Sequence, residues 1–149
     1  MPICRPEAGP PTGTAEYRVW EWLRNSLPDN AYLLAQVRLA DGPTSYEMDL
    51  IIAWPGVGIC LFEVKGGYVR VDRQPWISNN GHENHDIDPY PQAAHFRQLM
   101  TRHVQPRWHH HQRPEAAILI AIPDVRIPPG GEVVGVSRDI VVDQFDVPD

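Results

Sequence analysis

A chain of 149 residues suits one domain, and 42% hydrophobic against 21% charged residues excludes a disordered acidic tail or a fibrous repeat. No apolar run approaches the ~20 residues of a membrane-spanning helix, and two cysteines make no disulfide framework or structural zinc site. The net charge of −6 argues against a general polyanion binder, but not against an enzyme whose metal site needs clustered carboxylates. We expect a cytoplasmic protein that does not bind membranes.

The first half of the chain predicts one helix and three main strands. Residues 1–13 form a breaker-rich N-terminal extension, and we expect one domain over 14–149. A helix is predicted over 14–27, because Thr14 suits an N-cap and apolar residues recur every four positions after it. Alternating apolar residues bounded by turns predict strands over 31–39, 46–54 and 59–65, with a continuation over 68–72.

The second half predicts one more helix and one more strand. Residues 74–88 are polar and predict a loop, with Trp76 as an anchor. Apolar residues three and four apart predict a helix over 91–104, and a continuous apolar run predicts a buried strand over 116–122. Shorter apolar pieces follow at 133–136 and 140–142. The order α-β-β-β-α-β indicates an α/β fold with helices flanking a mixed sheet.

Four ionisable residues interrupt two of the apolar strands. Alternation places Glu47 and Asp49 on one face of the second strand, opposite Met48 and Leu50, and places Glu63 and Lys65 together on the third. Lys65 is the only lysine among 13 basic residues. One interpretation is a set of ion pairs on a solvent-facing edge; the other is a divalent cation held by Asp49 and Glu63. The spacing alone does not decide between them.

The ordered motifs resemble a known family. Glu47-Met48-Asp49 followed by Glu63-Val64-Lys65 is similar to the split PD-(D/E)xK nuclease signature. Glu16 on the preceding helix, and Pro89-Tyr90-Pro91-Gln92 before the next one, narrow the resemblance to the nuclease-related domain (NERD), over roughly residues 14–122. The resemblance implies a restriction-endonuclease-like core.

The resemblance also implies roles for individual residues. Asp49, Glu63 and the Val64 carbonyl would bind Mg²⁺ or Mn²⁺, and Lys65 would be the catalytic lysine. Glu16 would be an accessory acid, although an acid in a first helical turn also suits the helix dipole. Gln92 matches a glutamine of related nucleases, but Phe96 stands where they often have tyrosine. Whether Glu47 binds the metal in place of Asp49 stays open.

A basic segment lies between residues 89 and 114, where no Asp or Glu occurs. The residues expected to contact phosphates or stack on a base are Arg97, Arg102, Arg107, Trp108 and Arg113. The solvated face of an amphipathic helix explains the first two equally well. His109-His110-His111 would bind nickel or zinc only adventitiously.

The resulting hypothesis is metal-dependent hydrolysis of phosphodiester bonds in nucleic acid, with DNA as the expected substrate. The alternative is a catalytically weak nucleic-acid-binding or docking module attached to a helicase-type protein. The end of the chain at Val147-Pro148-Asp149 would suit either a cut before further domains or a natural terminus. Homodimerisation would suit double-strand cutting, although no residue establishes it.

Overall fold

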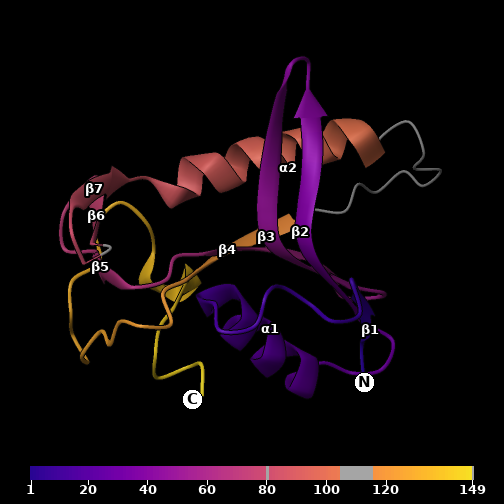
Figure 1. The fold of residues 1–149 in the computed structure, drawn as a ribbon, viewed down its shortest axis with the longest axis horizontal. Helices are drawn as coiled ribbons and strands as arrows, with labels where there is room; N and C mark the ends of the chain where they lie inside the picture. The colour runs from indigo at the N-terminus through magenta and orange to yellow at the C-terminus, as the bar shows by residue number, and fades with distance from the viewer. Residues whose placement is uncertain (80, 105–115, 149) are drawn as a thin grey trace.

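The computed structural model describes residues 1–79, 81–104 and 116–148. Its central feature is a six-stranded mixed sheet with the order β1-β2-β3-β4-β8-β9. The strands are β1 (Ile3–Arg5), β2 (Tyr32–Asp41), β3 (Thr44–Trp54), β4 (Gly58–Val64), β8 (Ala116–Ala121) and β9 (Val141–Val142). Strands β2, β3 and β4 are antiparallel neighbours, whereas β1 on β2, β8 on β4 and β9 on β8 are parallel. Helices α1 (Ala15–Ser26) and α2 (Pro89–Val104) cover opposite faces of the sheet (Figure 1). The predicted α-β-β-β-α-β core is confirmed.

Helix α1 begins where the sequence predicts. Thr14 is the N-cap, and its side chain accepts a hydrogen bond from the Tyr17 N–H at 3.1 Å, which satisfies an otherwise free donor of the first turn. The buried face carries Val19, Trp20 and Leu23, which pack with strand residues in one core cluster. Helix α2 packs through Ala93 and Phe96 on a second cluster, which the opposite face of the sheet supplies.

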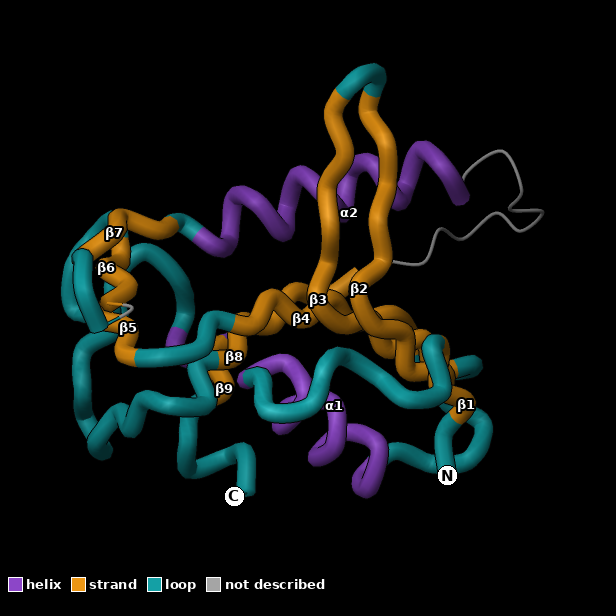
Figure 2. Tube along the Cα trace, in the orientation of Figure 1, coloured by secondary structure: helices purple, strands orange, loops and turns teal. Residues whose placement is uncertain are grey.

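The hairpin of β2 and β3 bends sharply out of the sheet (Figure 2). At the bend Gln36 has a φ of 53°, in the left-handed region, and it lies between the paired positions Ala35↔Leu50 and Val37↔Met48. Because of the bend, residues two apart in β3 no longer point to the same face of the sheet. Met48 packs in the core cluster of α2, whereas Leu50 packs in the core cluster of α1. The prediction that Met48 and Leu50 share a face is therefore wrong.

Residues 74–88 do not form the predicted loop. A second, three-stranded sheet contains β5 (Tyr68–Arg70), β6 (Trp76–Asn79) and β7 (Asn84–Ile87), in that order. It lies at the end of the molecule opposite β1 (Figure 1). Trp76 is buried, and its indole N–H donates to the Val134 carbonyl at 2.8 Å, so its predicted role as an anchor is confirmed. Distant contacts of this kind stabilise strands that are too short to show alternation.

Three smaller features complete the fold. Strand β1 lies inside the expected N-terminal extension and pairs with β2. The sequence of this segment does not predict a strand. The apolar piece at 133–136 forms no strand, whereas that at 140–142 contributes β9. In the described part of the chain, neither helix has the length and apolar character needed to cross a membrane.

Candidate active site

Asp49 and Glu63 face each other across the junction of β3 and β4. The antiparallel register pairs Leu50 with Phe62, so the next step along both strands brings Asp49 opposite Glu63. The backbone N–H of Val64 donates to Oδ2 of Asp49 at 2.7 Å, which fixes the orientation of this carboxylate. Glu63 is only 7% exposed. The structure thus brings together the two carboxylates that the sequence predicts as metal ligands.

Lys65 lies beside this pair. Its Nζ is 3.2 Å from Oε1 of Glu63, and its backbone N–H donates to the Ala121 carbonyl at 2.9 Å, which holds the residue against β8. An ion pair is therefore present, as one interpretation of the sequence expects. Its position differs from that interpretation, since the side chains of Glu63 and Lys65 are only 10% and 26% exposed. A surface pair would leave both groups in water.

Burial disfavours the charged form of both carboxylates. It raises the pKa of Asp49 from 3.8 to about 7, with the nearby charge of Glu63 as the second cause and the Val64 hydrogen bond opposing them. Burial also raises the pKa of Glu63, against the charge and hydrogen bond of Lys65. A cation between the two groups would relieve both the desolvation and the mutual repulsion. The electrostatics therefore favour binding of a positive ion.

Helix α1 brings a third acid close. Glu16 lies in the first turn of α1, and its charge contributes to the raised pKa of both Asp49 and Glu63. The helix approaches the turn after Lys65 so closely that a β-carbon on Gly66 would lie 2.8 Å from the β-carbon of Ala15. Only glycine at position 66 leaves room for this contact.

Asp124 ties the same elements together. Its Oδ2 accepts the N–H of Gly67 at 2.7 Å, and its Oδ1 forms an ion pair with Arg18 of α1. The turn after Lys65 is thus attached both to α1 and to the segment after β8. Neither Asp124 nor Arg18 is predicted from the sequence, and the glycine pair after Lys65 is the local signal for a close approach at this turn.

The donor set at this site suits a hard divalent cation. Carboxylate oxygens are the ligands that Mg²⁺ and Mn²⁺ prefer, and Mg²⁺ sites commonly contain one or two carboxylates completed by water and phosphate oxygens. Within the described ranges, no group of three or more His, Cys, Asp or Glu side chains is arranged to hold a metal ion. Asp49 and Glu63 thus fit a two-carboxylate site rather than a closed cage.

The other predicted residues lie at the margin of the carboxylate pair or outside it, and, after burial, the charge of Glu47 is a minor cause of the raised pKa of Glu63. Glu47 is exposed and pairs with Arg38 at 2.9 Å across the hairpin, which favours Asp49 as the inner acid. Gln92 is exposed, and no hydrogen bond joins it to either carboxylate in the part of the chain that the structure describes.

The basic segment is only partly described. Arg97 donates to the Ala116 carbonyl at 3.2 Å, so it connects α2 to β8, whereas Arg102 is exposed. The remaining predicted contacts lie outside the described residues; these are Arg107, Trp108 and Arg113, together with the histidines His109, His110 and His111.

Comparison with known proteins gives one match. A family model described as the nuclease-related domain matches residues 13–132. Curated proteins and solved structures yield no match. The matched range contains α1, both carboxylates, Lys65 and α2. Because this range covers well over half of its residues, the chain belongs to the nuclease-related domain family, a group of PD-(D/E)xK-like nuclease domains.

Proposed function

We propose that this protein is a phosphodiester hydrolase that cleaves DNA with Mg²⁺ or Mn²⁺ bound at Asp49 and Glu63. The observation that carries the proposal is the convergence of a buried carboxylate, Glu63, and a partly buried one, Asp49, both with raised pKa, beside the one lysine of the chain. Such a cluster of partly desolvated charges lowers the stability of the fold, so a functional role accounts for it better than a structural one. Membership in a nuclease-related family indicates that this role is cleavage of nucleic acid.

Each residue has a distinct part in the proposed reaction. The carboxylates of Asp49 and Glu63 and the carbonyl of Val64 would hold the cation. A cation held there would lower the pKa of a water molecule and offset negative charge that develops on the phosphate. The Lys65 ammonium, fixed by Glu63 and by its own backbone hydrogen bond, orients the attacking water or neutralises a phosphate oxygen. Glu16 adds negative charge at the same place, which strengthens cation binding.

Cleavage of plasmid and single-stranded DNA with Mg²⁺ or Mn²⁺ tests the proposal. We expect Asp49→Asn and Lys65→Ala each to reduce the rate by about 100-fold or more, in the range seen when a catalytic group is removed. Asparagine keeps an oxygen that can accept the Val64 N–H, so Asp49→Asn preserves the local fold while removing the charge.

Glu47→Gln is the matched control. Glu47 lies on the same strand two residues before Asp49, but it is exposed and pairs with Arg38. We expect Glu47→Gln to retain cleavage. Cutting that persists in Asp49→Asn and Lys65→Ala would instead point to a contaminating nuclease, and DNA binding without any cutting would favour a docking module.

A further inference from the structure

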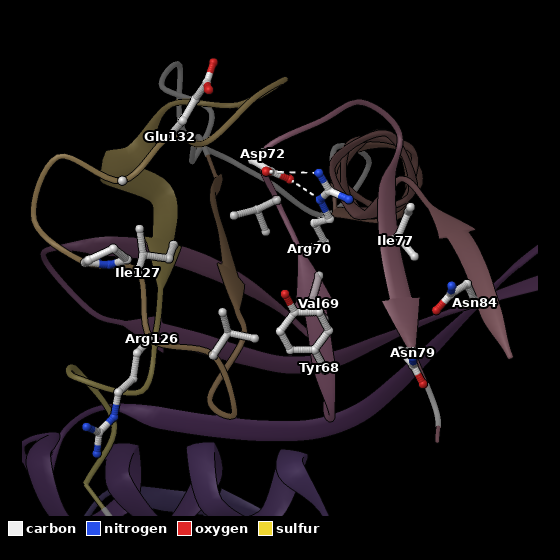
Figure 3. Close-up of a pocket in the computed structure, with 14 residues that line it drawn as sticks. Tyr68, Val69, Arg70, Asp72, Ile77, Asn79, Asn84, Arg126, Ile127 and Glu132 are labelled. Carbon is white, nitrogen blue, oxygen red and sulfur yellow. Dashed lines mark hydrogen bonds and ion pairs between the residues drawn. The ribbon is translucent and has the colours of Figure 1, made fainter. Parts of the chain in front are cut away.

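A groove lies between β5 and the segment that follows β8 (Figure 3). It has a volume of about 580 Å³, within the range of ligand-binding pockets. Tyr68 comes from β5 and Arg126 from the segment after β8, so they belong to facing walls. Asn79 of β6 and Asn84 of β7 line it further along.

The two walls are fixed to each other at both ends. At one end Asp124 accepts the N–H of Gly67 at 2.7 Å; at the other, Val134 donates its N–H to the Val71 carbonyl at 2.9 Å. The groove therefore exists before any ligand binds, and a ligand need not order it.

Tyr68 presents an aromatic ring to this groove. Val69 and Val71 are buried in the core, so strand alternation directs Tyr68 and Arg70 outward. Tyr68 is 62% exposed, so its ring is accessible to a ligand in the groove. Arg70 pairs with Asp72 at 2.6 Å, so its charge is already compensated.

Arg126 supplies a positive charge that no described carboxylate pairs with, although the acidic side chain of Glu132 also lines the groove. Its Nε donates to Oε1 of Gln144 at 2.8 Å, and its guanidinium lies 5.4 Å from the centre of the Phe145 ring. Both partners are neutral, and no carboxylate of the described residues forms an ion pair with Arg126. The side chain is thus positioned without losing its charge.

The groove begins next to the proposed catalytic lysine. Tyr68 follows Lys65 by three residues, so their Cα atoms are at most about 11 Å apart. A polynucleotide with a phosphate at Lys65 would reach the groove with the adjoining nucleotides.

We infer that the groove receives an unpaired nucleotide of the substrate strand, next to the bond that is cut. This inference rests on the proposed hydrolase function. The base stacks on Tyr68 and its phosphate meets Arg126. The amide of Asn84 and the Nδ2 group of Asn79, whose Oδ1 already accepts the N–H of Gly81 at 2.7 Å, offer hydrogen bonds to a base edge. A base inside a continuous duplex has both faces covered by its neighbours, so the substrate class is a single strand, a flap or a frayed end.

Binding without cleavage tests the inference. Fluorescence anisotropy with a labelled single-stranded oligonucleotide, in EDTA so that no cation supports cutting, gives the Kd of wild type and variants. We expect Tyr68→Ala to raise the Kd about tenfold and Tyr68→Phe to leave it nearly unchanged, because phenylalanine keeps the stacking face. We expect Arg126→Gln to raise the Kd as well, with partial recovery in Arg126→Lys and a smaller salt dependence in Arg126→Gln.

Tyr32→Ala is the matched control. Tyr32 is also an exposed tyrosine, at 41%, but it lies at the start of β2 beside β1, at the other end of the molecule (Figure 1). Equal Kd values for Tyr68→Ala and Tyr32→Ala would overturn the inference. So would the absence of oligonucleotide binding by the wild type, or tighter binding of a blunt duplex than of a single strand.

The outcomes separate this inference from the proposed function. Metal-dependent cleavage that does not depend on Tyr68 or Arg126 would overturn the inference about the groove and would still support the proposed hydrolase function. Binding that depends on both residues, with no cleavage under any cation, would keep the groove and remove the hydrolase.

Discussion

The β-carbon of Ala15 occupies the space that a side chain on Gly66 would need: an added β-carbon there would lie 2.8 Å from it. Helix α1 is therefore seated directly on the turn that follows Lys65. This contact makes the position of Glu16 depend on a glycine fifty residues later in the chain.

Gly66→Ala tests that dependence. We expect it to displace the start of α1, to lower the free energy of unfolding by about 1–3 kcal/mol through overpacking, and to reduce DNA cleavage. The double variant Ala15→Gly with Gly66→Ala restores the space, so it should recover most of both losses. Urea denaturation and cleavage rates measure the effect; a double variant no better than Gly66→Ala would show that the contact is not the cause.

Divalent cations should stabilise the fold through Asp49 and Glu63. A ligand that binds only the folded state adds about 2.7 kcal/mol when its concentration is 100 times its Kd. We expect Mg²⁺ or Mn²⁺ to raise the Tm of the wild type, measured by differential scanning fluorimetry, and to leave the Tm of Asp49→Asn unchanged. Monovalent salt at equal ionic strength serves as the control for general screening. An equal rise in wild type and Asp49→Asn would place the cation elsewhere.

Without a cation, the stability of the fold should fall as the pH rises. Asp49 has a folded pKa of about 7 against an ordinary value of 3.8, so between these values the folded state retains a proton that the unfolded state has lost. The contribution of protonated Asp49 to the free energy of unfolding is fully present below about pH 4, declines between about pH 4 and pH 7, and no longer changes above about pH 7. We expect Asp49→Asn to flatten this slope and to be more stable than wild type at pH 8 in EDTA. A parallel slope in the variant would assign the effect to other groups.

The affinity for the cation should also depend on the titration of Asp49, but it should rise with pH where the stability of the cation-free fold falls. A proton and a divalent ion compete for Asp49, so we expect the Mg²⁺ affinity to fall by up to tenfold per pH unit below about pH 7 and to level off above it. Calorimetric titrations from pH 5.5 to 8.5 measure this directly. An affinity that stays constant over the whole range would contradict ligation by this carboxylate.

Asp124→Ala should harm cleavage more than stability. The loss of a half-exposed ion pair and one hydrogen bond costs about 1 kcal/mol, but it releases the turn that positions Lys65. Arg18→Gln removes only the ion pair and keeps the acceptor for Gly67. We expect Arg18→Gln to cleave at nearly the wild-type rate, measured beside its Tm. Equal losses of cleavage in the two variants would mean that the ion pair, and not the Gly67 hydrogen bond, holds the turn.

The sequence predicts the parts of this fold that local signals determine. Helix α1 follows from the cap at Thr14 and from apolar residues four apart, both of which act within a few turns. The identity of Asp49, Glu63 and Lys65 follows from charged residues inside apolar strands and from the family resemblance. Their roles remain a prediction.

The remaining parts depend on contacts between distant segments. The left-handed conformation of Gln36 has no local signature, so simple alternation misplaces the neighbours of Asp49. Strand β6 has four residues and relies on the hydrogen bond from Trp76 to Val134, which lies 58 positions away. Asp124 is unremarkable until the fold brings it to Gly67.

The three-stranded sheet has a consequence for how this family can diversify. The walls of the groove come from β5, β6 and β7 and from residues 125–132, whereas Asp49 and Glu63 belong to strands of the central sheet. If the groove binds the substrate strand as we propose, insertions or exchanges in those outer segments would change which polynucleotide ends fit and would leave Asp49 and Glu63 in place. Relatives with identical acids would then act on differently shaped ends, and grafting these two segments between them would transfer the preference.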